Sequence, residues 1–499
     1  MNRLCPIVLA GLFVPAGAWA AGQTVPAQFA SEREQDRGPA QRSEKGKRSQ
    51  PDESSAASSK DKDSESDDKK SKNGDEAKKD DKEKAGDLWP DWLGAHGQGT
   101  VVSQGNWKFR SPYEGPNSLR PILNERTTET ATLYLDAKLW HGADVVFNPE
   151  LSGGRGLSGT TGLAGFPNGE ATRVGIPQPT PYVARLFLRQ AIGLGGEQED
   201  VEDGPNQLAG KRDVNRVTVR IGKMAATDNF DDNAYSHDPR TQFLNWSLMY
   251  NGAWDYPANT RGYTYGATVE LNQKDWAWRY GVFGEPTEAN GSEIDPRFLR
   301  ANGHVTEFEY RFTTDNRPGK ARLLAYWNNA HMGNYREALA LAAGGPPDVT
   351  ATRAYRAKYG FGLNLEQELA DDLGAFARLG WNDGRTESWA FTEIDRTASA
   401  GLLWKGTSWS RPEDRVGLAV VVNGVSGPHR DYLAAGGVGF IVGDGALRYG
   451  PEEILEAFYS LQVRKGIVVS LDLQGVNNPA YNRDRGPAGI AGVRAHFEY

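Results

Sequence analysis

Residues 228–246 are rich in side chains that could hold a polar solute. The hydrogen-bonding groups of this stretch are Asp228, Asn229, Asp231, Asn233, Asp238, Arg240 and Asn245. Its flat apolar surfaces are Phe230, Tyr235 and Trp246. A few polar groups beside aromatic rings are typical of small-molecule sites. Two structural roles compete with binding, because Asp and Asn commonly form turns and Trp246 could pack a loop against neighbouring strands.

Patterns for catalysis are weak. The seven histidines include no His-x-x-x-His pair and no compact cluster at metal-ligand spacing. Ser158 lacks the second glycine of a nucleophile elbow, and Gly443-Asp444-Gly445 is not followed by the Gly-Lys-Ser/Thr of a phosphate loop. Carboxylates that could form a glycosidase pair fit the polar face of a strand equally well; they are Glu452, Glu453 and Glu456. We therefore expect no enzymatic activity, no metal and no cofactor.

The elements that would position these residues follow from a period of two. In residues 491–499 (AGVRAHFEY), Val493 and Phe497 share one face of a strand, while Arg494 and His496 share the other. An apolar row that continues to a final aromatic residue favours a strand that closes a barrel in lipid. An edge strand of a soluble sandwich is the alternative on this segment alone.

The same alternation continues through residues 88–499. Its segments approach the roughly 9–11 residues of a tilted membrane strand, and their polar faces suit a water-filled lumen. Trp140, Trp381 and Trp404 end apolar rows where an interfacial girdle would lie. Residues 148–181 and 330–353 are expected long loops, and residues 382–384 a tight turn. The pattern predicts an all-β, antiparallel transmembrane barrel with inward-folded constriction loops.

The strand number follows from parity. About seventeen extended segments can be counted, but bacterial single-chain barrels have even strand numbers. Residues 241–250 (TQFLNWSLMY) fit a short helix as well as a strand and lie between Asp238-Pro239 and Tyr256-Pro257. We expect this segment to lie outside the wall, which leaves sixteen strands around an aqueous channel.

The amino-terminal region has a different composition. Residues 1–20 are typical of a secretory signal, with Arg3, an apolar run and a small-residue cleavage site. The only cysteine, Cys5, would be removed with this signal. Residues 21–87 are dominated by Lys, Asp, Glu, Ser and Gly, so we expect a disordered periplasmic tether, with a cell-wall or periplasmic partner as an alternative role. The net charge of −8 argues against nucleic acid as a partner.

Four segments carry a family resemblance. Residues 229–246, residues 181–190 (PYVARLFLRQ), residues 434–461 (AAGGVGFIVGDGALRYGPEEILEAFYSL) and the ending GIAGVRAHFEY together resemble the carbohydrate-selective outer-membrane porins of the OprB type. The resemblance implies passive diffusion of monosaccharides and similar small sugars through a pore narrowed by loops. The expected constriction residues are Arg185, Arg189, Asp228, Asn233, Tyr235, Asp238, Arg240, Asn245 and Trp246.

Other functions remain open at this point. A general or anion-preferring porin is suggested by Arg185, Arg189 and Arg220. A secreted sugar-binding or sugar-cleaving β-protein would dissolve without detergent, and a structural envelope protein would depend on the charged tail. The expected partners are small sugars and outer-membrane lipid, with the chain present as a monomer or a homotrimer.

Overall fold

The computed structural model describes residues 90–173 and 177–499. The signal expected at residues 1–20 and the tether expected at residues 21–87 lie outside the described residues. None of the helices in residues 90–173 and 177–499 has the length and apolar character of a transmembrane helix.

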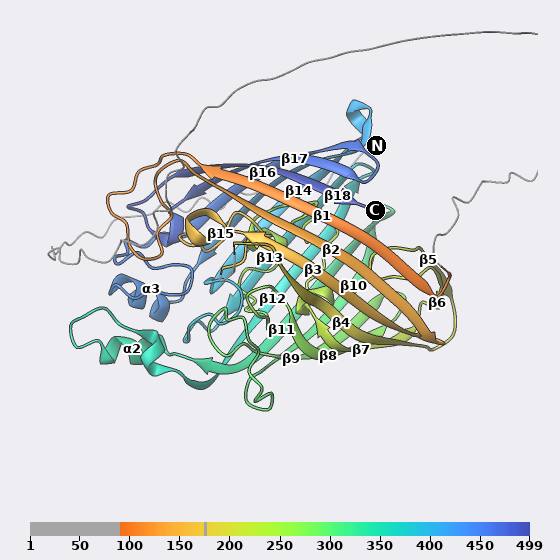
Figure 1. Cartoon of the computed structure of the whole chain (residues 1–499), viewed down its shortest axis with the longest axis horizontal. Helices are drawn as coiled ribbons and strands as arrows, with labels where there is room; N and C mark the ends of the chain where they lie inside the picture. The colour runs from red at the N-terminus through yellow and green to blue at the C-terminus, as the bar shows by residue number, and fades with distance from the viewer. Residues whose placement is uncertain (1–89, 174–176) are drawn as a thin grey trace, which may run out of the picture. The chain divides into compact units, whose positions relative to one another are not determined.

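Sixteen antiparallel strands close into a barrel (Figure 1). The wall strands are β1 (Leu93–Asn106), β2 (Asn124–Trp140), β3 (Ala143–Gly154), β4 (Thr180–Gly193), β7 (Arg216–Met224), β8 (Thr264–Asn272), β9 (Trp276–Gly284), β10 (Asn302–Thr314), β11 (Arg317–Met332), β12 (Ala354–Ala370), β13 (Leu373–Asn382), β14 (Arg396–Gly406), β15 (Arg411–Gly424), β16 (Glu452–Arg464), β17 (Ile467–Asn477) and β18 (Ala488–Glu498). The predicted fold class and strand number are confirmed.

The terminal strand closes the wall as its alternation predicts. Strand β18 pairs with β1, with Val101 opposite Ala495. Val493 and Phe497 are 46% and 45% exposed on the outer face, whereas Arg494 and His496 are buried in the interior. His496 Nδ1 lies 2.7 Å from Thr100 Oγ1 across the closing seam. Closure pairs the backbone of both end strands, so the barrel has no free edge in the membrane.

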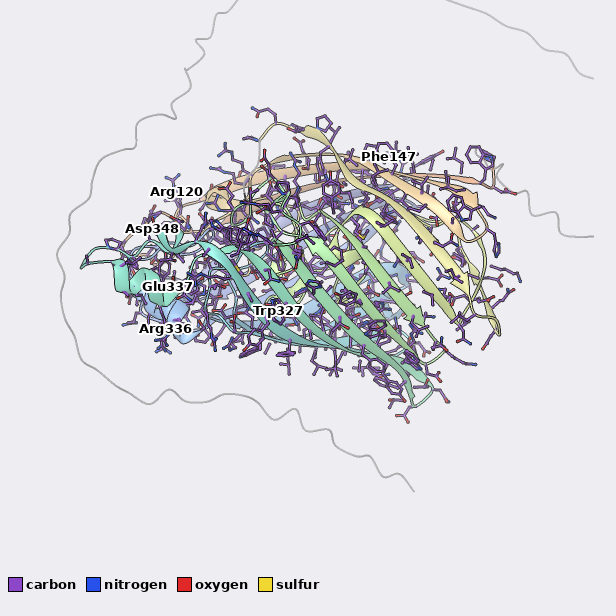
Figure 2. All side chains as sticks on the ribbon, turned by 90° about the horizontal axis from the view of Figure 1, so that it is seen from below. Arg120, Phe147, Trp327, Arg336, Glu337 and Asp348 are labelled. Atoms are coloured by element: carbon purple, nitrogen blue, oxygen red, sulfur yellow. The ribbon has the colours of Figure 1, made fainter. Side chains whose placement is uncertain are left out.

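The two ends of the barrel differ in loop length. Tight turns such as Asp315-Asn316 join strands at the end where β18 finishes, and both residues of this turn have positive φ, as hairpin turns require. Longer connections lie at the opposite end and include α2 (Tyr335–Leu341) and α3 (Gly427–Ala434). Figure 2 shows Arg336, Glu337 and Asp348 at this loop end, and Phe147 and Trp327 on the strands, where both are exposed. Short 3₁₀ turns occupy Leu157–Gly159, Ala226–Asp228, Val349–Thr352, Thr407–Trp409 and Pro479–Tyr481.

The prediction of a tight turn at residues 382–384 is wrong. Strand β13 ends at Asn382 and β14 begins only at Arg396, so these residues open a long connection at the loop end. The connection folds back because the Asp255 carboxylate accepts hydrogen bonds from the backbone N–H groups of Trp389, Ala390 and Phe391. A partner distant in sequence therefore overrides the local turn signal of Asn382-Asp383-Gly384.

One connection at the tight-turn end is also long. Residues 194–215, between β4 and β7, contain a separate hairpin of β5 (Gln198–Val201) and β6 (Gly210–Asp213). Its tip folds against lumen side chains: Asn148 donates a 2.7 Å hydrogen bond to Asn206 Oδ1, and His96 Nε2 lies 3.0 Å from Asp203 Oδ2. This hairpin was not predicted from the sequence, and it narrows the turn-side mouth.

Shortening this connection is expected to widen the channel. Glu197 and Val214 are already joined by a 2.8 Å backbone hydrogen bond, so two glycines could replace residues 198–213 and keep the backbone pairing of β4 with β7, although Arg216 would lose its Glu199 partner. Single-channel conductance should rise, because the side chains that contact His96 and Asn148 would be removed. Unchanged conductance in a folded, heat-modifiable barrel would show that the hairpin does not restrict the mouth.

Candidate functional site

The connection between β7 and β8, residues 225–263, folds into the lumen and is called the central loop below. It contains the short helix α1 (Trp246–Met249), whose four residues are all buried. Residues 241–250 therefore lie outside the wall, as predicted from parity, and the structure places them inside the barrel. Phe230 packs edge-on against Trp254 and Phe283, with ring centroids 6.3 and 6.2 Å apart. The central loop therefore occupies part of the lumen, and a solute would pass beside it.

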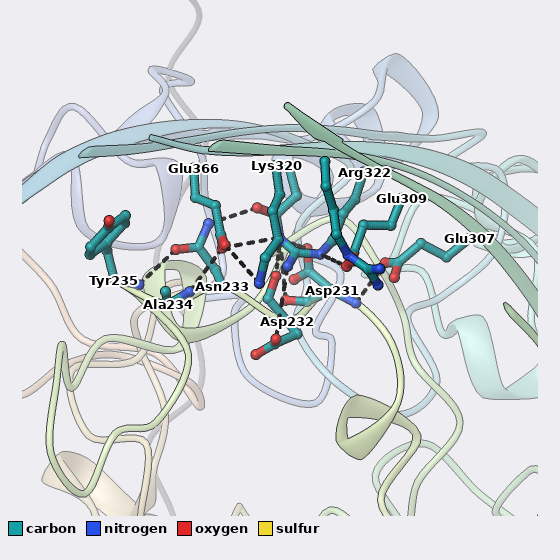
Figure 3. A network of polar contacts seen from close by, with 12 residues as sticks. Asp231, Asp232, Asn233, Ala234, Tyr235, Glu307, Glu309, Lys320, Arg322 and Glu366 are labelled. Carbon is teal, nitrogen blue, oxygen red and sulfur yellow. Dashed lines mark hydrogen bonds and ion pairs between the residues drawn. The ribbon is translucent and has the colours of Figure 1, made fainter. Parts of the chain in front are cut away.

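Carboxylates on the inner wall accept hydrogen bonds from the backbone of the central loop (Figure 3). Glu307 Oε2 accepts from Asp231 N at 2.7 Å, and Glu366 Oε2 from Ala234 N at 2.9 Å. On the far side of the loop, Glu456 accepts from Leu244 N and Asn245 N at 2.6 and 3.1 Å. Buried N–H groups require such acceptors. Glu456 is thus an anchor of the central loop.

Asp231 makes several of the contacts that hold the central loop to the inner wall. Its carboxylate accepts from Arg378 Nε at 3.2 Å, from Asn364 Nδ2 at 2.7 Å and from Asn251 N at 2.7 Å. Arg378 also donates to the backbone oxygens of Leu248 and Ser236, so one guanidinium holds three points of the central loop. Asp231 has a φ of 58°, a backbone conformation that Asp tolerates better than most residues.

Replacing Asp231 with alanine should loosen the central loop. The change leaves the buried Arg378 charge without its carboxylate, and breaking a buried ion pair destabilises by about 3–5 kcal/mol. We expect a lower free energy of unfolding in a urea titration and larger fluctuations of the open-channel current. The neighbouring Asp232, whose side chain is 60% exposed, offers a matched control: Asp232→Ala should change both quantities little. Equal effects of the two substitutions would contradict the anchoring role of Asp231.

A cavity of about 180 Å³ remains between the central loop and the wall strands β2, β3 and β4. We call it the upper cavity. The loop after β3 contributes to its lining as well. Its charged side chains are Glu150, Glu170, Arg185, Asp238, Arg240 and Arg261. Its aromatic side chains are Tyr182, Trp246, Tyr250, Tyr256, Tyr263 and Phe391. Dense donors and acceptors next to rings are what a sugar, with hydroxyl edges and apolar C–H faces, would require.

Arg240 organises the charges of the upper cavity. Its guanidinium donates to Glu170 Oε1 at 3.0 Å and to Glu150 Oε2 at 3.2 Å, and it reaches Tyr134 Oη at 3.4 Å. Burial opposes the charge of Arg240, but Glu170 and Glu150 outweigh burial and raise its pKa well above its ordinary value. The two carboxylates therefore favour the cationic form of Arg240.

Two further arginines lie against tyrosine rings. The Arg185 guanidinium donates to both oxygens of Asp228, at 2.8 and 2.6 Å, and stands 5.2 Å from the centroid of Tyr263. Arg261 lies 4.1 Å from the centroid of Tyr182 and donates to Ser152 Oγ at 2.7 Å. Stacking and ion pairing fix these guanidinium planes while leaving donors free toward the cavity.

The predicted constriction residues fall into three groups. Arg185, Asp238, Arg240 and Trp246 line the upper cavity, and Asp228 holds Arg185 there. Arg189 lies further along β4 toward the tight turns, paired with Asp144. The remaining three residues are Asn233, Tyr235 and Asn245, which face the wall.

The wall-facing group has structural partners. Asn233 donates to Asn364 Oδ1 at 2.7 Å. The Tyr235 ring lies over Gly374, where an added Cβ would collide with it. Asn245 caps α1 by accepting from Ser247 N and donates to Gln474 Oε1 at 3.0 Å. Trp246 is also packed, with its ring against Phe166 and Phe391 and its Nε1 donating to Asn168 O at 2.7 Å. Contact of these residues with a solute stays a prediction.

Several cavity residues were not singled out from the sequence. Glu150, Glu170, Tyr182, Arg261 and Tyr263 come from four separate segments that only the folded chain brings together: β3, the loop after it, β4 and the central loop. Tyr182 lies in PYVARLFLRQ, one of the segments that carried the family resemblance, and this was the only available signal. Among residues 90–173 and 177–499, no group of three His, Asp or Glu side chains is arranged to hold a metal ion.

A closed sixteen-stranded barrel with an apolar outer face, a charged interior and a loop folded into the lumen is a porin of the bacterial outer membrane. The family model described as carbohydrate-selective porin, OprB family, matches residues 124–499. The chain therefore belongs to this family, and its barrel is a channel for small carbohydrates. Members of the family are channels rather than enzymes.

The fold of this chain is shared by a solved porin, and a second solved channel shows a weaker likeness. The high-pH structure of Pseudomonas putida OprB is 17% identical, with 82% of this chain and 94% of that chain covered and a TM-score of 0.63. The outer-membrane channel DcaP of Acinetobacter baumannii is 8% identical, with 82% and 97% covered and a TM-score of 0.46. No curated protein matches the sequence significantly.

Proposed function

We propose that the upper cavity is the constriction at which this porin selects monosaccharides and similar small sugars during passive diffusion. The observation that carries the proposal is the pairing of each cavity arginine with a carboxylate or a tyrosine ring. Three cations and three carboxylates line the cavity, so its charges are balanced. Balanced charge gives a neutral polyol many hydrogen-bonding partners without favouring a simple ion.

The tyrosines contribute the apolar part of this selection. Tyr182 and Tyr263 lie 6.0 Å apart between ring centroids, and each is covered by an arginine. Burial, reinforced by Glu150, raises the pKa of Tyr263 well above its ordinary value, so its hydroxyl stays protonated. A protonated phenol can donate to or accept from a sugar hydroxyl. The C–H faces of a sugar would lie against the exposed parts of the rings.

Arg261 is the best position to test this constriction. Its guanidinium has no buried carboxylate that removal would strand, unlike that of Arg240, and Trp246→Ala would leave a hole in the loop core. Arg261→Gln should weaken the saturable block of single-channel current by glucose about three- to tenfold. The variant loses about one hydrogen bond to the sugar, and it loses the cation–π contact that holds the Tyr182 ring in place. Arg297 stands 5.2 Å over Tyr355 outside the cavity, so Arg297→Gln is a matched control.

The outcome distinguishes a selective constriction from a general pore. Weaker glucose block in Arg261→Gln and unchanged block in Arg297→Gln would support the proposal. Glucose block that is equal in both variants and in the unmodified protein would contradict it. Wild-type current indifferent to glucose would favour the general porin instead.

A further inference from the structure

A second cavity, called the lower cavity here, lies at the tight-turn end beneath hairpin β5–β6. Its volume is about 340 Å³. The strands β2, β3, β4, β7 and β8 line one side, and residues of the 194–215 connection line the other. Six cationic side chains face it: Lys138, Arg189, Lys211, Arg212, Arg216 and Arg220. Four carboxylates line it as well, and two more, Glu199 and Asp200, pair with its cations from just outside the lining.

The two cavities follow one another along strand β4. Arg185 lines the upper cavity and Arg189 the lower cavity, on the same face of the strand. Four residues of extended chain span about 13 Å at roughly 3.3 Å per residue. A solute that leaves the upper cavity toward the tight turns therefore meets the lower cavity next.

Most lower-cavity cations are neutralised within the protein. Arg189 donates to both oxygens of Asp144 at 3.0 and 2.5 Å. Arg212 and Arg216 share Glu199, at 2.6 and 3.0 Å. Lys211 lies 3.3 Å from Asp200. Among the described residues, Arg220 and Lys138 are left with no carboxylate within 4.0 Å, and Arg220 is the deeper of the two.

The register around Arg220 concentrates positive charge. Arg220 on β7 is directly opposite Arg189 on β4, and like charges in such cross-strand pairs destabilise the sheet. Its guanidinium donates to Asn229 Oδ1 at 2.7 Å. On its other side, Arg220 is opposite Thr268 of β8, whose hydroxyl is buried without a hydrogen-bond partner. Arg220 thus has no carboxylate within 4.0 Å, although Glu270 of β8 lines the same cavity and acts on it electrostatically, and the unused Thr268 hydroxyl lies opposite it across the strand pair.

We propose that Arg220 and Thr268 bind the carboxylate of a sugar acid as it passes from the upper to the lower cavity. The planar guanidinium fits a carboxylate through paired N–H donors, and the Thr268 hydroxyl can donate to the same group. The ligand is a sugar acid rather than a simple anion because it reaches this point past the upper cavity. The inference rests on the proposed function in that respect, since it requires a sugar in the lumen.

The test compares the block of single-channel current by gluconate, glucose and acetate in planar bilayers containing the full chain. Gluconate should block saturably. In Arg220→Gln, the apparent affinity for gluconate should fall about ten- to a hundredfold, the range of a charge-assisted hydrogen-bonded pair. Glucose block should be unchanged, because Arg220 lies outside the upper cavity. Arg220→Lys, which keeps the charge but lacks the planar fork, should retain part of the gluconate affinity.

Thr268→Val provides a second variant that removes only a buried, unpartnered hydroxyl, so the barrel should fold. Its gluconate affinity should fall about threefold to tenfold. Gluconate block that is equal in wild type, Arg220→Gln and Thr268→Val would overturn the proposal, as would acetate block as strong as gluconate block. Absence of glucose block in the wild type would defeat the proposed function alone, because the effect of Arg220 on gluconate is read separately.

Discussion

The constraint on which this structure depends is the burial of a long irregular loop inside a barrel. Each backbone N–H of the central loop that leaves water must find an acceptor, or the fold loses roughly 1–3 kcal/mol per group. The inner wall supplies carboxylates for this purpose. Glu456 accepts from Leu244 N and Asn245 N of the central loop, and Glu452 does the same for Ala164 and Gly165 of the loop after β3. Many of the charged side chains inside the barrel therefore serve first to hold the inward-folded loops in place, and the remaining ones are available to a solute.

The same anchors decide where the pore can lie. The acceptors for the central loop are on β10, β12 and β16, with Arg378 on β13. Side chains of these strands are committed to the loop and leave little open space beside it. The upper cavity remains on the opposite side, against β2, β3 and β4. Anchoring on one side of the wall thus leaves a narrow passage on the other, and that passage is lined by the arginines and tyrosines available for a solute.

Fold prediction from the sequence succeeded where the signal was periodic. Alternation along residues 491–499 gave the outer and inner faces of β18, and parity placed residues 241–250 outside the wall. The hairpin β5–β6 was missed because its strands are short and its tip is held by distant residues such as Asn148. The tight turn at residues 382–384 was wrong because Asp255, more than a hundred residues away, holds the following segment.

Site prediction was more limited. The stretch 228–246 does line the lumen, but polarity could not separate residues that face the cavity from those that face the wall. Asn233 and Arg240 are seven residues apart and equally polar, yet one bonds to β12 and the other lies in the cavity. Glu150 and Tyr182 reach the same cavity from β3 and β4 through pairing across the sheet, which no local pattern encodes.

The most direct test of the account is the single-channel conductance of the refolded protein while glucose, and then a non-sugar solute of similar size, is titrated in. A constriction matched to sugars predicts a current that falls saturably with glucose and only by the change in bulk conductivity with the other solute. A current that responds identically to both solutes would contradict selection of sugars by the upper cavity. The barrel and its central loop would then form a general porin.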